Sequence, residues 1–85
     1  MGITVRYFAA VREKLGPQEA VELGELPNAT VGGLLGWLQG RSPVHAAALD
    51  ESRGLRMALN QALCDVDEPL SDGDEVAFFP PVTGG

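Results

Sequence analysis

The residues of this chain best suited to chemistry are its last six, Pro80-Pro81-Val82-Thr83-Gly84-Gly85. Two consecutive prolines favour an extended backbone and cannot donate hydrogen bonds to a sheet. The glycines that follow have no Cβ, so the backbone can pass through a narrow channel and adopt angles closed to other residues. Six extended residues reach roughly 20 Å. We therefore expect residues 80–85 to form a thin, flexible tail with the Gly85 carboxylate as its reactive group.

Two other side chains, Cys64 and His45, are candidates for chemistry. Cys64 is the only cysteine, and no histidine lies near it in sequence to activate it, so we interpret it as a small core residue. A small thiol enzyme that uses Cys64 is the rival hypothesis. His45 has no Cys, Asp or second His at metal-ligand spacing, which predicts a surface or hydrogen-bonded histidine and no metal site.

Composition restricts the class of protein. The 85 residues suffice for one small domain, and a net charge of −6 argues against nucleic acid and anionic membranes as partners. A single cysteine allows no intrachain disulfide, and we find neither a signal peptide nor a run long enough to span a bilayer, so we expect a cytoplasmic protein. Six acidic residues between positions 65 and 75 predict either a solvated, turn-rich surface or a patch that steers a basic partner.

The elements that must position the tail begin with a predicted pair of antiparallel strands. Alternation predicts strands over residues 3–8 and 18–23, joined by a short helical turn over residues 9–15. The residues of the first strand that would face the core are Ile3, Val5 and Tyr7. This pattern leaves Phe8, a large ring, on the polar side.

Helix signals occupy the middle of the chain. Thr30 is a typical N-cap, and apolar residues recur after it at helical spacing, so we predict the main helix between Thr30 and Arg41. Four glycines in it should oppose the apolar stripe, each costing up to about 1 kcal/mol relative to alanine. They are Gly32, Gly33, Gly36 and Gly40. A second short helix is predicted over residues 44–49 with Ser42 as its cap, and residues 50–54 are predicted to form a loop.

A hairpin is predicted further along, with strands over residues 55–59 and 62–65. Asn60-Gln61 would form its two-residue turn, because Asn tolerates positive φ. This register pairs Arg56 with Asp65 at the open end. The residues that it places on the core face are Met57, Leu59, Ala62 and Cys64.

The last predicted strand covers residues 75–79, with Val76 and Phe78 facing inward, and leads directly into the tail. The order of elements predicts an α+β domain over residues 1–79, followed by the tail at 80–85. We expect a mixed sheet of four to five strands packed against one main helix plus short helical turns.

Three large apolar side chains fall on the solvent face of the predicted sheet: Phe8, Leu63 and Phe79. One exposed apolar residue needs no explanation, but three on one face beside the tail predict a contact patch. The alternative is an error of one residue in the predicted register of a strand, which would move the side chains of that strand to the opposite face of the sheet.

These segments carry a resemblance to a known family. Asn60-Gln61, the run from Pro69 to Phe79 and the ending at 80–85 closely resemble the small subunit of molybdopterin synthase, the MoaD sulfur carrier family. The N-terminal run from Tyr7 to Glu13 is similar to that family as well. The resemblance runs end to end and implies a ubiquitin-like β-grasp fold.

The resemblance implies a carrier with most of its catalytic machinery on other proteins. A partner adenylating enzyme of the MoeB type would use ATP to activate Gly85, and a sulfur donor would convert it to a thiocarboxylate. The carrier itself would bind no cofactor. The molybdopterin synthase large subunit, of the MoaE type, would accept the tail in a heterotetramer. The partner-binding residues that this implies are Phe8, Leu63, Phe79, Pro80, Pro81, Val82, Thr83 and Gly84.

Two rival functions share the Gly-Gly ending. One is a β-grasp sulfur carrier for thiazole synthesis or tRNA thiolation. The other is a ubiquitin-like modifier, which needs the same adenylation but forms an amide with lysine. The residues that precede the glycines, Phe78 to Val82, favour the molybdopterin branch.

Overall fold

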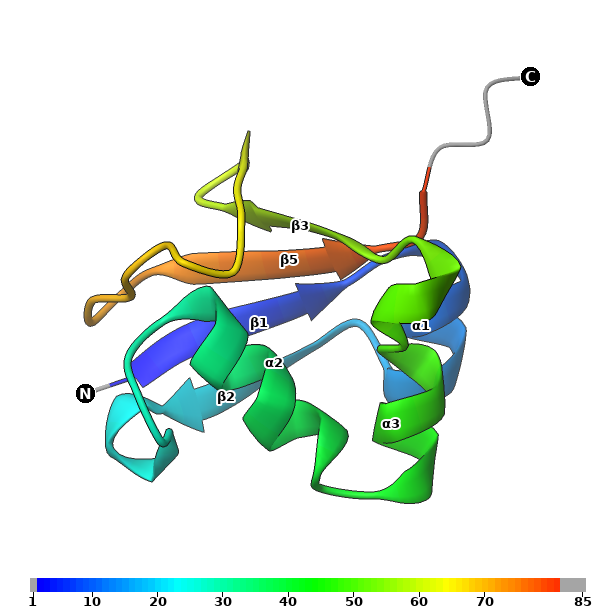
Figure 1. Cartoon of the computed structure of the whole chain (residues 1–85), viewed down its shortest axis with the longest axis horizontal. Helices are drawn as coiled ribbons and strands as arrows, with labels where there is room; N and C mark the ends of the chain where they lie inside the picture. The colour runs from blue at the N-terminus through cyan, green and yellow to red at the C-terminus, as the bar shows by residue number, and fades with distance from the viewer. Residues whose placement is uncertain (1, 82–85) are drawn as a thin grey trace.

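A computed structural model describes residues 2–81 of the chain (Figure 1). Its centre is a five-stranded sheet in the order β2-β1-β5-β3-β4. The strands are β1 (Gly2–Tyr7), β2 (Gln18–Glu22), β3 (Arg56–Leu59), β4 (Ala62–Leu63) and β5 (Glu75–Phe79). The helices are α1 (Ala9–Leu15), α2 (Val31–Gln39) and α3 (Pro43–Ala48), with 3-10 turns at Leu23–Glu25 and Glu51–Arg53. Within residues 2–81, no helix is long and apolar enough to cross a bilayer.

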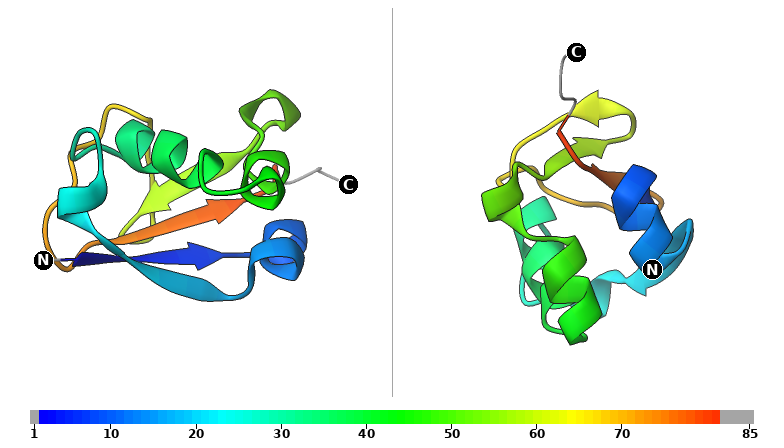
Figure 2. Two further views of the ribbon diagram at one scale, coloured as in Figure 1. Left: turned by 90° about the horizontal axis from the view of Figure 1, so that it is seen from below. Right: turned by 90° about the vertical axis from the view of Figure 1, so that its right-hand side faces the viewer.

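β1 and β5 run parallel at the centre of the sheet, with Thr4 paired to Glu75 and Tyr7 to Phe78. The neighbouring pairs, β1 with β2 and β3 with β5, are antiparallel, so the sheet is mixed as predicted. Parallel strands need a long crossover connection, and α2 and α3 lie in it and cover one face of the sheet (Figure 2). Because β1 and β5 end side by side, α1 and the tail leave the sheet at the same end.

The core lies between this sheet face and the helices. Side chains alternate along β1 and β5 as predicted, and the inward ones meet the apolar stripe of α2. The fully or nearly buried residues from these elements are Ile3, Val5, Tyr7, Val76 and Phe78 from the strands and Val31, Leu34, Leu35 and Leu38 from α2. The rings of Tyr7 and Phe78 stack with their centroids 6.4 Å apart.

Side-chain caps fix where the helices begin. Thr30 Oγ1 accepts a hydrogen bond from the Gly33 N–H at 3.0 Å, and Ser42 Oγ accepts one from the His45 N–H at 3.1 Å. Both predicted caps are therefore confirmed. Residues 50–54, predicted as a loop, instead contain a 3-10 turn that Asp50 caps through the Ser52 N–H.

The glycines of α2 have different roles, and the prediction that all of them oppose the apolar stripe is wrong for Gly33. Gly33 is buried, and a Cβ there would lie 2.3 Å from two oxygens of Asn28. A Cβ at Gly32 would lie 3.1 Å from Val66, whereas one at Gly36 would meet nothing within 4 Å. The loop before the helix thus packs so closely on its first turn that only glycine fits at position 33.

The hairpin turn at Asn60-Gln61 is confirmed, with φ angles of 50° and 72° and pairs Leu59–Ala62 and Ala58–Leu63. However, β4 ends at Leu63, so the predicted pairing of Arg56 with Asp65 does not form. Of the four residues expected on the core face, Met57 is buried, while Leu59 and Cys64 are only partly buried and pack against the core. Ala62 is exposed, as is Leu63, the other residue of this two-residue edge strand.

The contrast between two glycines of α2 gives a test of this packing. We expect Gly33→Ala to destabilise the domain by about 1–3 kcal/mol, because the new methyl group overlaps Asn28. The control, Gly36→Ala, should be neutral or stabilising by up to about 1 kcal/mol, because alanine is the better helix former and has room there. Urea unfolding of the two variants measures both effects. Equal stabilities for the two would contradict the packing.

Candidate functional site

The outer face of the sheet, opposite the helices, carries a shallow hollow. Its walls include Phe8, Leu63 and Phe79, which we call the outer patch. The exposed fraction is 39% for Phe8 and 64% for Leu63, and Phe79 is half-buried. The structure thus brings together the three apolar residues that sequence parity placed on this face. The alternative of a register slip is excluded, because every strand that contributes keeps its predicted parity.

Sheet register explains why these three side chains meet. Phe8 directly follows Tyr7, the partner of Phe78, so its ring lies at the same level as that of Phe79. Ala58 pairs with Leu63 on one side and with Ala77 on the other. Both alanines are buried, and the hollow is lined by them and by the larger side chains. Small residues at these two positions therefore create the depression that the aromatic rings and Leu63 surround.

Charged groups border the outer patch. The Arg6 guanidinium lies 5.4 Å from the centroid of the Phe8 ring and 3.8 Å from a carboxylate oxygen of Glu75. Arg6 and Glu75 both line the hollow. An apolar centre with a polar rim is the usual composition of a protein–protein contact site.

The base of the tail is held against the domain. Pro80 and Pro81 line a groove between α1 and α3, and a Cβ at Gly54 would lie only 3.2 Å from Pro81 Cγ. Gly54 also has a φ of +82°, which favours glycine. Sequence reasoning missed this contact, although a glycine that ends a 3-10 turn is a signal for it. The remaining predicted tail residues, Val82, Thr83, Gly84 and Gly85, lie outside the described residues.

Cys64 has the environment of a structural thiol. It is partly buried and packs against the core. Burial raises the pKa of its thiol, and the carboxylates of Glu68 and Asp65 add to the rise. Because the thiolate is the reactive form, these surroundings disfavour nucleophilic chemistry. Among residues 2–81, no cluster of three or more His, Cys, Asp or Glu side chains could hold a metal ion.

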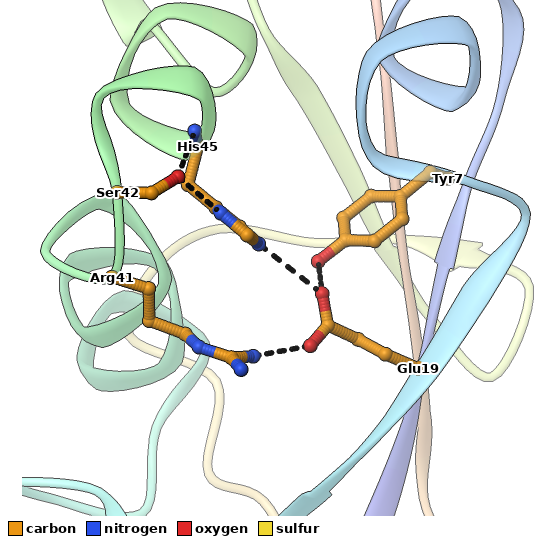
Figure 3. A network of polar contacts seen from close by, with 5 residues as sticks. All are labelled: Tyr7, Glu19, Arg41, Ser42 and His45. Atoms are coloured by element: carbon orange, nitrogen blue, oxygen red, sulfur yellow. Dashed lines mark hydrogen bonds and ion pairs between the residues drawn. The ribbon is translucent and has the colours of Figure 1, made fainter.

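A polar network lies on the helical side of the sheet, and sequence reasoning did not find it (Figure 3). At its centre is Glu19 of β2, which accepts a 2.6 Å hydrogen bond from the Tyr7 hydroxyl. Arg41 pairs with the other carboxylate oxygen, and His45 Nε2 lies 3.4 Å from the first. Ser42 Oγ contacts the second ring nitrogen of His45 at 2.8 Å. The partners of Glu19 are distant from it in sequence, so no local sequence pattern predicts these contacts.

The network resembles a Ser-His-acid constellation in composition but has a structural role. Ser42 Oγ is already the N-cap of α3, because it accepts the His45 N–H. Burial and the Glu19 hydrogen bond both raise the pKa of the Tyr7 hydroxyl, which therefore stays protonated as a donor. Burial tends to raise the pKa of Glu19, but its bonds from Tyr7, His45 and Arg41 outweigh this and lower it. The network ties β1 and β2 to α3 and to the turn that precedes it.

Comparison with known proteins identifies the family. The sequence matches the ThiS family over residues 5–85. This chain belongs to the ThiS family. It is 46% identical over 83 residues to the molybdopterin synthase sulfur carrier subunit of Escherichia coli, covering 98% of this chain and 99% of that protein. Identity to the subunit of the same name from Mycobacterium tuberculosis is 42%, with 98% and 96% covered. The family membership predicted from the sequence motifs is confirmed.

Solved structures confirm the fold class. SAMP1 from Haloferax volcanii superposes with a TM-score of 0.75 at 28% identity over the full length of both chains. A complex of subunits 1 and 2 of the molybdopterin-converting factor from Helicobacter pylori contains a chain that matches with a TM-score of 0.67 at 30% identity, again over both full lengths. The predicted ubiquitin-like β-grasp fold is thus confirmed for this member of the ThiS family.

The Glu19 network gives a pH-dependent test of stability. Since the folded pKa of Glu19 lies below its ordinary value of 4.5, the network stabilises the fold at higher pH and is lost as pH falls through the folded pKa. We expect Glu19→Gln to lower the free energy of unfolding by about 1 kcal/mol at neutral pH. The difference from the unaltered chain should shrink below pH 4.5. Urea unfolding at several pH values measures it.

The matched control is Glu13→Gln on α1. The Glu13 side chain is exposed and has no hydrogen bond or ion pair with any residue from 2 to 81, so the substitution should change stability by less than about 0.5 kcal/mol. A loss for Glu19→Gln no larger than that of the control would show that the network does not stabilise the fold.

Proposed function

We propose that this chain is the sulfur carrier subunit of a molybdopterin synthase, acting in molybdenum cofactor biosynthesis. The observation that carries the proposal is the full-length identity of 46% to a protein of that name in Escherichia coli. The position of the tail supports it. β5 leads straight into Pro80-Pro81 at the edge of the outer patch, so a partner bound on the patch lies next to the tail.

The proposed chemistry takes place at the Gly85 carboxylate. A carboxylate is a poor electrophile, so an oxygen of Gly85 first attacks the α-phosphorus of ATP and pyrophosphate leaves. The terminal sulfur of a donor persulfide then attacks the carbonyl carbon, and AMP leaves. A thiol cleaves the sulfur–sulfur bond and releases the thiocarboxylate, which transfers its sulfur to the molybdopterin precursor.

Partner proteins supply the catalytic groups for these steps. An adenylating enzyme of the MoeB type holds ATP and the carrier tail, and a large subunit of the MoaE type receives the loaded tail. The Helicobacter pylori complex of subunits 1 and 2 supports pairing with such a subunit, because its matching chain has the same fold and 30% identity. We propose a heterotetramer with a carrier at each end of a large-subunit dimer, and a cytoplasmic setting.

The outer patch is the proposed docking surface. An exposed Leu63 and the two aromatic rings offer apolar area that folding of this chain leaves uncovered. Each aromatic side chain can bury about 150–250 Å² when fully covered. Arg6 and Glu75 at the border give polar contacts that fix the orientation of the partner.

A second candidate function is protein modification. The likeness to SAMP1, a small archaeal modifier protein from Haloferax volcanii, favours it at 28% identity. Both functions start from the same acyl-adenylate and differ in the nucleophile that follows. A sulfur nucleophile gives a thiocarboxylate, whereas the amine of a lysine on another protein gives an amide.

Deletion of Gly85 tests the reactive terminus. We expect the shortened chain to gain no sulfur, because its terminal carboxylate no longer reaches the catalytic groups of the partner. Intact mass spectrometry after incubation with a MoeB-type enzyme, ATP and a sulfur donor measures the oxygen-to-sulfur exchange. The unfolding midpoint should stay unchanged, since the core lies within the domain. A truncated chain that still supports molybdopterin formation would contradict the carrier function.

Leu63→Asp tests the docking surface. A buried carboxylate in the patch should weaken binding to the large subunit at least about tenfold, equal to about 1.4 kcal/mol. The control is Val44→Asp, because Val44 is also exposed, at 51%, but lies on α3 and not in the outer patch. Calorimetry of both variants with the large subunit measures the affinities. Equal affinities for the two would place docking elsewhere.

A further inference from the structure

Arg6 holds a charged group beside the outer patch without a hydrogen-bond acceptor. Within residues 2–81, its Nε atom is buried and has no hydrogen-bond partner. A carboxylate oxygen of Glu75 lies 3.8 Å from Nη1, which makes an ion pair but exceeds the length of a hydrogen bond. The side chain as a whole is 42% exposed, and it lines the hollow on the outer face of the sheet. Another molecule in the hollow can therefore reach the guanidinium.

Sheet register gives Arg6 a fixed place relative to the hollow. Arg6 pairs with Ala77, Ala77 with Ala58, and Ala58 with Leu63. Paired residues project to the same face of a sheet, so these four form one row across four strands. The two alanines are the low centre of the row, with Arg6 at one end and Leu63 at the other. A side chain laid along this row meets apolar atoms first and a cation at its end.

The Phe8 ring holds the guanidinium in position without using its donors. Phe8 lies two residues after Arg6 on the same face, and its ring centroid is 5.4 Å from Arg6 Cζ. A cation–π contact of this kind leaves the N–H groups free, because they lie in the plane of the guanidinium. The group is therefore ordered before any partner binds, which lowers the entropy cost of binding.

The geometry of the free donors selects the kind of acceptor. Glu75 faces Nη1, so the opposite edge of the guanidinium, formed by Nε and Nη2, has no acceptor among residues 2–81. Two parallel N–H donors match the two oxygens of one carboxylate, whereas a backbone carbonyl offers a single oxygen. A docked partner also removes water from the charge, and a negative charge placed on this edge offsets that loss.

We propose that Arg6 is a recognition residue of the docking surface and binds an aspartate or glutamate side chain of the large subunit that enters the hollow. The inference rests on the proposed function, because it names the partner group for the same surface. The outer patch supplies apolar area, and Arg6 supplies selectivity. A protein with a basic or apolar group at this point leaves the guanidinium buried without an acceptor, and its binding is disfavoured.

The test is calorimetry of the full chain with the large subunit at low and at high salt. Arg6→Leu should lower the affinity at least about tenfold, since it leaves a partner carboxylate buried without its cation. Arg6→Lys should keep part of the affinity, because lysine retains the charge but loses the two-donor edge. Rising salt should weaken binding of the unaltered chain more steeply than binding of Arg6→Leu.

The matched control is Arg41→Leu, which removes the same charge on the helical side of the sheet (Figure 3). Its affinity should stay within about twofold of the unaltered chain. Its unfolding midpoint should fall, because Arg41 pairs with Glu19. Arg6→Leu should not lower the midpoint, since the Arg6 side chain makes no hydrogen bond with residues 2–81 that leucine would lose. The two variants thus separate binding from folding.

Substitutions on the large subunit locate the acidic group. Its aspartates and glutamates are changed one at a time to asparagine and glutamine. One such change should weaken binding of the unaltered chain and have no further effect on binding of Arg6→Leu, which is the mark of two residues in direct contact.

Three outcomes would overturn the inference. They are equal affinities for Arg6→Leu and the unaltered chain, a loss that Arg6→Lys does not reduce, and a set of large-subunit variants in which no acidic residue is coupled to Arg6. In each case the unaltered chain still binds and the proposed function stands. A chain that does not bind the large subunit at all would remove both, so the two failures are distinguishable.

Discussion

The parallel pairing of β1 with β5 is the constraint on which the rest of the structure depends. It places the first and last strands side by side at the sheet centre, with Tyr7 level with Phe78. Because both strands end together, the residue after β1, Phe8, and the last residue of β5, Phe79, are neighbours, and they supply two of the three residues of the outer patch. The same pairing starts α1 beside Pro80 and Pro81, so the tail leaves next to a helix that holds its base.

The two faces of the sheet are divided by side-chain size. The inner face uses large residues, with Tyr7 and Phe78 stacked beneath the helices. The outer face uses alanine at its centre, at positions 58 and 77, and large residues only at its border. Large side chains at the centre would fill the hollow and leave a flat surface. The inner face of the sheet thus packs into the core, and the outer face presents an apolar hollow to solvent.

Local patterns predicted those parts of the fold that depend on neighbouring residues. Alternation gave the parity of the strands, and the hydroxyls of Thr30 and Ser42 gave the helix starts, because caps and pleats act within a few residues. The Glu19 network escaped prediction, since its partners are 12 to 26 residues away and their meeting depends on packing of the helices against β2. The contact of Gly54 with Pro81 was missed for the same reason.

Two of the acidic residues between positions 65 and 75 accept hydrogen bonds within the domain. Asp72 accepts the Gly2 N–H at 2.7 Å, and Asp74 accepts from Asn60 and the Ser71 N–H. The Asn60 bond first, and then the Ser71 bond, lower the pKa of Asp74. The carboxylates of Asp72 and Asp74 therefore make hydrogen bonds within the domain, and these bonds hold the turn that leads into β5. The earlier acids, Asp65, Asp67 and Glu68, are exposed and remain the candidates for attraction of a basic partner.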